Sequence, residues 1–161
     1  MIRRKHIALT TKQQLTVATL AACALAWPAF GSTDSPVERP FRSQATVTWT
    51  VNLLDNSAIG HEIGVATHGG LYINESSAIW DLDNFFIVSG AGVATVASGE
   101  QLFWKMTPDQ PMVVQFAGGT GHFENAIGSF STVSMSEPVI AVEGMTMTMT
   151  ISYTAVGTIT Y

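Results

Sequence analysis

The sequence predicts an all-β protein, an antiparallel barrel or sandwich of about eight strands. Three observations predict this class. Apolar and polar residues alternate with a period of two in several segments, turn signals separate those segments, and no segment beyond the N-terminal leader shows ten residues of helical periodicity. Short strands at this spacing, rich in Thr and Gly, are typical of antiparallel barrels and sandwiches.

The first residues have the three parts of an export signal. A basic stretch at 3–6 precedes an apolar stretch at 15–26 and a small-residue pattern that ends at Gly31. We therefore expect residues 1–31 to be an export signal, with cleavage near Gly31 and a secreted or periplasmic bacterial product. The alternative is a lipoprotein, because residues 20–23 resemble a lipobox ending at Cys23. The chain stays apolar after Cys23, so plain secretion is the preferred interpretation.

Composition and charge exclude several classes of protein. The chain is 47% hydrophobic and only 12% charged, against about 25% charged in a typical domain, which excludes a disordered chain. Three cations remain beyond the leader, Arg39, Arg42 and Lys105, against twelve acidic residues, so the mature net charge is −9. Such a chain is a poor partner for nucleic acid or for an anionic membrane surface. Because Cys23 is the only cysteine, the mature fold has no disulfide and no thiol chemistry.

The elements follow in order after the leader. Residues 32–43 contain two prolines and several charges and are predicted to be an exposed tether. The barrel domain is expected over residues 44–161. Its strands are predicted where apolar residues alternate with polar ones, at 46–53, 102–106, 112–116 and 145–154. Turns are predicted at Asp55-Asn56-Ser57, Gly69-Gly70, Ser98-Gly99-Glu100, Pro108-Asp109 and Gly118-Gly119-Thr120-Gly121.

Two motifs carry a resemblance to a known family. Residues 64–68 read Gly-Val-Ala-Thr-His, and about fifty residues later comes Gly-Gly-Thr-Gly-His-Phe at 118–123, followed by Ala126 and Gly128. This pattern resembles the allene oxide cyclase and dirigent-like barrels, and their small secreted bacterial relatives most of all. The resemblance implies a single eight-stranded antiparallel barrel with a central cavity, often assembled into homo-dimers or trimers. It also implies apolar or phenolic ligands held by a few polar groups deep in the barrel. His122 stands where these relatives usually have Arg or Lys.

The glycine motif itself has a structural interpretation. A Gly-rich loop can hold phosphate where it opens a helix, but no helix is predicted here and no Lys ends the loop. We expect Gly118, Gly119, Thr120 and Gly121 to form a turn or bulge, with Phe123 closing the end of the barrel.

Histidines and carboxylates offer candidates for a metal site. These are His61, Glu62, His68, Asp81, Asp83, His122 and Glu124. Their spacing matches no zinc pattern, so no metal and no cofactor are predicted. Asp81 and Asp83 share one face of a strand, where paired carboxylates can raise one pKa, but the preferred interpretation is that they line the solvent face of a strand whose other side carries Trp80 and Leu82. No nucleophile elbow or Ser-His-Asp arrangement is present. His68, Asp81 and Glu124 remain the candidates for acid or base.

Large apolar side chains are the candidates for ligand contact. Met145, Met147 and Met149 share one face of the last predicted strand. Trp49 and Trp104 lie on the apolar faces of the strands predicted at 46–53 and 102–106. Exported copper-binding proteins use such methionines for Cu(I), but core packing explains them with fewer assumptions.

The leading functional hypothesis is a secreted, non-catalytic barrel that binds a small apolar or aromatic ligand or a protein partner. An isomerase or cyclase like the plant relatives is the alternative. A third hypothesis is a structural assembly module whose barrel is filled by its own side chains. A cavity that contains an isolated carboxylate favours the enzyme, and a cavity lined only by Met, Trp and Phe favours binding.

Overall fold

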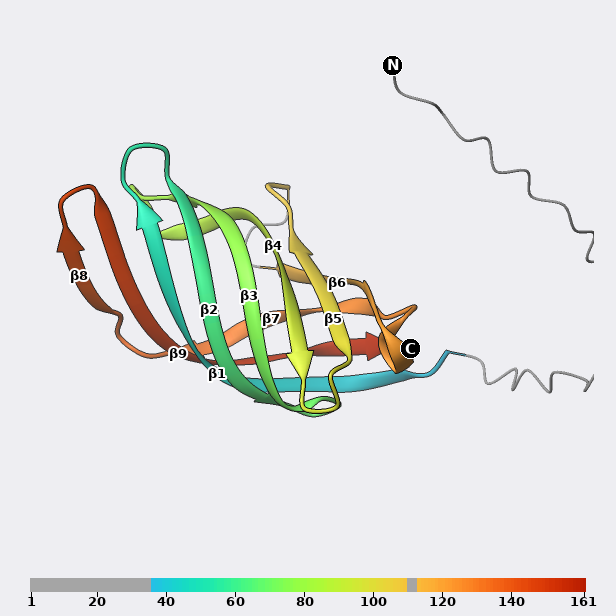
Figure 1. Cartoon of the computed structure of the whole chain (residues 1–161). Helices are drawn as coiled ribbons and strands as arrows, with labels where there is room; N and C mark the ends of the chain where they lie inside the picture. Colours follow the sequence, from blue (N-terminus) through green and yellow to red (C-terminus); the bar gives the residue numbers. More distant parts are fainter. Residues whose placement is uncertain (1–35, 110–112) are drawn as a thin grey trace, which may run out of the picture. The chain divides into compact units, whose positions relative to one another are not determined.

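A computed structural model describes residues 36–109 and 113–161. The expected export signal, Cys23, the cleavage position near Gly31 and Met112 lie outside the described residues. Within those residues the chain forms nine strands and one short 3-10 helix (Figure 1). They are β1 (Glu38–Asn52), β2 (Ser57–Ala66), β3 (Gly70–Asp81), β4 (Phe86–Val96), β5 (Gln101–Met106), β6 (Val113–Gly119), η1 (Gly121–Phe123), β7 (Ile127–Met135), β8 (Val139–Glu143) and β9 (Thr146–Thr160).

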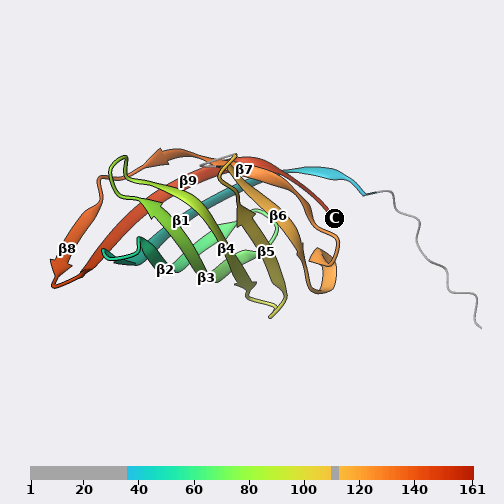
Figure 2. The ribbon, with the colours of Figure 1, turned by 90° about the horizontal axis from the view of Figure 1, so that it is seen from above.

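Eight of these strands close into an antiparallel barrel. The order is β1 to β7 and then β9, and β9 pairs back onto β1 from Glu38↔Thr160 to Asn52↔Thr146. The prediction of an all-β, eight-stranded antiparallel barrel is therefore confirmed. The ninth strand, β8, pairs with β9 beside the part of β9 that β7 does not reach. Figure 2 shows β1 and β9 running side by side along the barrel.

The barrel begins earlier than the sequence predicts. Residues 38–43, expected within the tether, belong to β1 and pair with β9, and Phe41 and Ser43 are buried. The two prolines misled the prediction. Pro40 is compatible with β1 because the pairing of β1 with β2 starts only at Ser43, so one side of this segment is an edge, where a missing N–H is tolerated.

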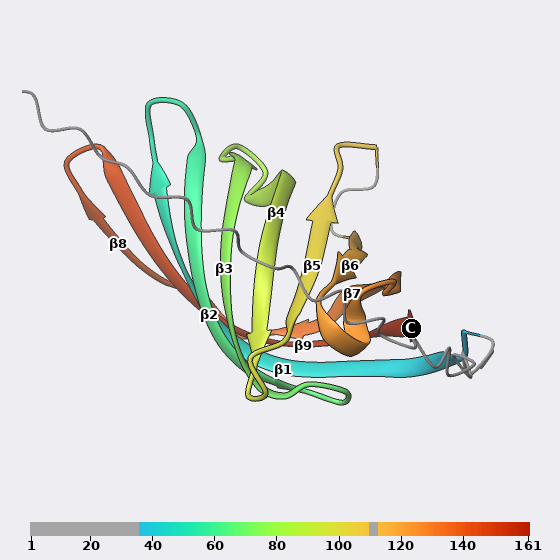
Figure 3. The ribbon, with the colours of Figure 1, turned by 45° about the vertical axis from the view of Figure 1, so that its right-hand side comes forward.

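The two ends of the barrel differ. One end, here called the open end, carries the turns at 53–56, 82–85 and 144–145, and the strands spread apart toward it (Figure 3). The other, the closed end, carries the turns at 67–69 and 97–100 together with η1. Phe123 of η1 is only 1% exposed and packs among the apolar residues of this end.

The interior is built in layers. Near the closed end lies one apolar cluster, which includes Phe41, Leu102, Phe116, Phe123 and Ile159. Near the open end lies a second cluster, which includes Trp49, Val51, Trp80, Met147 and Met149. Tyr153 packs against both clusters. The buried polar residues of the barrel are Ser43, Glu62, Asn74 and Ser76.

Strands β2 and β3 reverse the usual division between inside and outside. Their inward positions include Glu62, Asn74 and Ser76, whereas many of their exposed positions are apolar. The exposed apolar residues of this pair are Ile59, Ile63, Val65, Leu71, Ile73 and Ile79.

The described residues contain no helix that is long and apolar enough to cross a membrane.

Candidate functional site

A cavity of about 370 Å³ occupies the barrel lumen. This volume lies within the range of small-ligand sites, which is about 300–1,000 Å³. Aromatic and aliphatic side chains make up most of its wall, and Glu62 is the only carboxylate among the described residues that line it. Three lining residues at the open end, Phe85, Met135 and Pro138, are exposed to solvent, so the lumen is reached from that end.

Glu62 is the centre of a buried polar network. It lies on β2, is 7% exposed, and accepts hydrogen bonds from three side chains. Tyr72 and Tyr153 donate their hydroxyls to Oε1 at 2.5 and 2.7 Å, and Asn74 donates Nδ2 to Oε2 at 3.1 Å. Trp104 donates Nε1 to the Asn74 Oδ1 at 2.9 Å, which fixes the orientation of the Asn74 amide. The network thus joins β2, β3, β5 and β9 across the lumen.

Two inward glycines give the network its space. A side-chain carbon on Gly64 would lie 2.6 Å from the Tyr72 hydroxyl, and one on Gly92 would lie 2.6 Å from the Trp104 indole. Both distances are far below van der Waals contact, so a side chain at either position would clash with the aromatic ring in its present place.

The electrostatics of the network keep both tyrosines protonated. Burial raises the pKa of Tyr72 and of Tyr153 far above the ordinary value of 10.0, and the negative charge of Glu62 raises each pKa further. Both hydroxyls therefore act as donors. A carboxylate offers about four acceptor positions. Donors from the described residues fill three of them, which leaves one on Oε2.

A second polar group in the lumen has no partner. The Nε1 of Trp80 is buried and makes no hydrogen bond among the described residues. Trp80 lines the same cavity and packs edge to face against Trp49, with ring centroids 5.8 Å apart. The Oγ of Ser43, another residue of the cavity wall, is likewise buried and makes no hydrogen bond among the described residues, so the wall holds two such atoms besides the open acceptor on Glu62.

The structure separates the ligand candidates that the sequence placed together. Trp49, Trp104 and Met149 line the cavity. Met147 is buried in the apolar cluster of the open end and does not line it. Met145 is 52% exposed, because it lies in the turn between β8 and β9, where Gly144 has a positive φ and the alternation has not yet begun.

The acid and base candidates lie apart from one another. His68 lines the cavity near the closed end, with Nε2 2.9 Å from the carbonyl oxygen of Pro40. Asp81 caps the turn after β3 by accepting bonds from Asp83 and Asn84, and its hydrogen bond with the Asn84 side chain is the main cause of its lowered pKa. Glu124 is exposed. Within residues 36–109 and 113–161, no group of three His, Cys, Asp or Glu side chains is placed to hold a metal ion.

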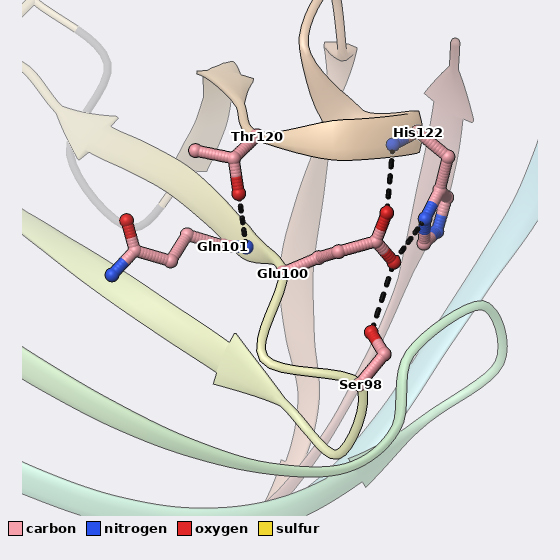
Figure 4. A network of polar contacts seen from close by, with 5 residues as sticks. All are labelled: Ser98, Glu100, Gln101, Thr120 and His122. Carbon is pink, nitrogen blue, oxygen red and sulfur yellow. Dashed lines mark hydrogen bonds and ion pairs between the residues drawn. The ribbon is translucent and has the colours of Figure 1, made fainter.

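The glycine motif belongs to a separate network that fastens the closed end (Figure 4). Glu100 accepts bonds from Ser98 Oγ at 2.9 Å and from the backbone N–H of His122 at 3.0 Å, and pairs with His122 Nδ1 at 2.5 Å. The backbone bond is the main cause of the lowered pKa of Glu100. Gln101 donates its N–H to Thr120 Oγ1 at 2.8 Å. These contacts hold Gly118–Phe123 across the barrel end and keep Phe123 buried.

Sequence reasoning missed most of the lumen network. Glu62 was considered only as a metal ligand, and Tyr72, Asn74 and Tyr153 were not singled out. The sequence held one sign of this network. In an extended strand Tyr72, Asn74 and Ser76 point to the same face as Trp80, a residue that is expected to be buried. No family model, curated protein or solved structure matches this chain. Fold and site together define a closed antiparallel barrel with a ligand-sized lumen.

Proposed function

We propose that this protein binds one small apolar or aromatic molecule in the barrel lumen, without catalysis. The observation that carries the proposal is the 370 Å³ cavity, whose wall is largely aromatic and aliphatic and whose polar groups are few. Apolar walls supply affinity, and a few fixed polar groups set orientation. The ligand would give a hydrogen-bond donor to the open acceptor position of Glu62.

Two further lines of support come from the sequence. The leader and the nearly thiol-free composition favour a secreted or periplasmic carrier. The motifs at 64–68 and 118–128 resemble allene oxide cyclase and dirigent-like barrels, which hold apolar or phenolic molecules in the same kind of lumen. Homo-dimers or trimers are part of this proposal, and the apolar outer face of β2 and β3 is consistent with them.

A pair of variants on β4 tests the proposal. Ala94 lines the cavity, whereas Ala91 on the same strand is exposed. Native mass spectrometry and displacement of a hydrophobic dye would measure occupancy. We expect Ala94→Phe to abolish binding by filling the lumen and Ala91→Phe to leave it intact. Equal binding by both variants, with both folded, would show that the dye does not enter the lumen.

An isomerase or cyclase is the second candidate, and Glu62 favours it. A buried carboxylate held in place by two tyrosine hydroxyls can stabilise positive charge that develops on an apolar substrate. Glu62 is hydrogen-bonded rather than isolated, so binding comes first. An isomerase would convert a captured ligand into a product of the same mass and a different chromatographic retention, and Glu62→Gln would stop this conversion.

The third hypothesis, a purely structural module, needs a lumen filled by its own side chains. The cavity of about 370 Å³ speaks against complete filling.

A further inference from the structure

Glu62 has no cationic partner in the lumen. None of the described residues that line the cavity is Lys or Arg, and no ion pair among the described residues involves Glu62. Arg39, Arg42 and Lys105 are also absent from the cavity wall. The carboxylate is therefore held by neutral donors alone, namely two hydroxyls and one amide.

A buried carboxylate without a cation is costly. Hydrogen bonds from neutral groups offset part of the lost hydration, and an opposite charge offsets more of it. The two tyrosines cannot supply that charge because they are neutral when protonated. The remaining acceptor position on Oε2 is the place where a positively charged donor from a ligand would complete the network.

The surrounding wall suits a cation with an apolar body. Trp49, Trp80 and Trp104 line the cavity together with several phenylalanines. Aromatic rings attract cations, and this attraction is stronger where water is excluded. An anionic ligand would instead meet the charge of Glu62 with no Lys or Arg to offset it.

We propose that the lumen selects small apolar amines, bound as ammonium ions with an N–H donated to Glu62, over neutral or anionic molecules of the same size. This inference rests on the proposed ligand-binding function, because it names the chemical class that the same cavity takes.

A matched series of three probes tests it in the unaltered protein. Octylamine, octanol and octanoate share one apolar chain and differ in the head group, and near neutral pH the amine is protonated because its pKa is about 10. Tryptophan fluorescence or calorimetry would give each dissociation constant. We expect octylamine to bind about tenfold tighter than octanol, as for a hydrogen bond to a charged group, and octanoate to bind weakest.

Two variants locate the effect. Glu62→Gln keeps the shape of the side chain and removes its charge, so the advantage of octylamine over octanol should vanish while octanol still binds. Glu75→Gln removes the same charge from the exposed outer face of β3 and should change nothing. Octanol binding as tightly as octylamine, or octanoate binding tightest, would overturn the amine inference and leave the binding proposal standing. If none of the three probes binds the unaltered protein, the binding proposal fails with it.

Discussion

The pair β1 and β9 and the pair β2 and β3 form neighbouring parts of one barrel wall, yet they distribute polarity in opposite ways. On β1 and β9 most inward residues are apolar, such as Trp49 and Met149, and many outward residues carry hydroxyls. Thr46 and Ser152 bond to each other at 2.8 Å, and Thr48 and Thr150 at 3.1 Å, so a ladder of hydroxyls covers the outside.

On β2 and β3 the inward residues include Glu62 and Asn74, and apolar residues face outward. The outer register places Ile63 opposite Ile73 and Val65 opposite Leu71. The comparison shows that different parts of the barrel wall have different roles. β1 and β9 supply mainly apolar packing, whereas β2 and β3 supply Glu62 and its partners Tyr72 and Asn74 and expose several large apolar side chains.

The largest expected effect on stability comes from the pair β1 and β9, here called the packing wall; the pair β2 and β3 is called the polar wall. Trp49 is 5% exposed, and its ring fills the space beside Gly60. Trp49→Ala should lower the free energy of unfolding by about 3–5 kcal/mol, as for a deleted core aromatic. Urea denaturation measures the change, and Thr50→Ala, at the exposed neighbouring position, is the control. If Trp49→Ala loses no more stability than the control, the packing of Trp49 on β1 does not contribute to the stability of the core.

The polar wall should respond to loss of its acceptor. Glu62→Ala removes the group to which Tyr72, Tyr153 and Asn74 donate, and leaves three buried donors without a partner. We expect a loss of about 2–3 kcal/mol, because unpaired donors keep their desolvation cost. Glu62→Gln should lose less, since its carbonyl still accepts. If Glu62→Ala proves as stable as the unaltered protein, water fills the site and the network contributes no stability.

The sequence predicted the packing wall well and the polar wall poorly, and the reason is physical. Alternation identifies a strand and assigns its apolar parity to the core, which is correct for Val47, Trp49 and Val51. The same rule applied to β3 would send Leu71 and Ile73 inward, whereas the structure turns Tyr72 and Asn74 inward. Closure of the barrel fixes the register of each strand through its neighbours, and one sequence does not reveal that choice.

The candidate site shows the same limit at the level of single residues. The sequence assigns no role in the site to Gly64 or Gly92, yet each makes room for an aromatic ring from a neighbouring strand. Glu62 and Tyr153 are 91 positions apart in the chain and meet only because β9 closes the barrel. Spacing along the chain carries no information about such a pair.

Alkaline pH tests the buried network that joins the two pairs of strands, because Tyr72 lies on β3 and Tyr153 on β9. The folded protein raises the pKa of Tyr72 and Tyr153 above the 10.0 of an unfolded chain. Their contribution to stability is complete below pH 10 and is lost as pH rises above it, by about 2–3 kcal/mol per pH unit for the two together. Urea denaturation across this range, with tyrosinate absorbance, measures the loss. The Tyr72→Phe, Tyr153→Phe double variant should lose less per pH unit, and an equal slope would place the cause elsewhere.

The smallest effect is expected on the apolar exterior of β2 and β3. Ile63 and Ile73 are exposed and lie opposite each other. Replacing them therefore removes little of the apolar surface that is buried on folding. Ile63→Thr and Ile73→Thr should each change the free energy of unfolding by less than about 0.5 kcal/mol. The comparison becomes sharper if the measurement is repeated across protein concentrations. A large loss that grows on dilution would mean that a second copy covers this face in solution, because stability then depends on protomer concentration. In that case both faces of the β2 and β3 pair would be buried, and Ile63 and Ile73 would be interface residues of the expected homo-dimer or trimer.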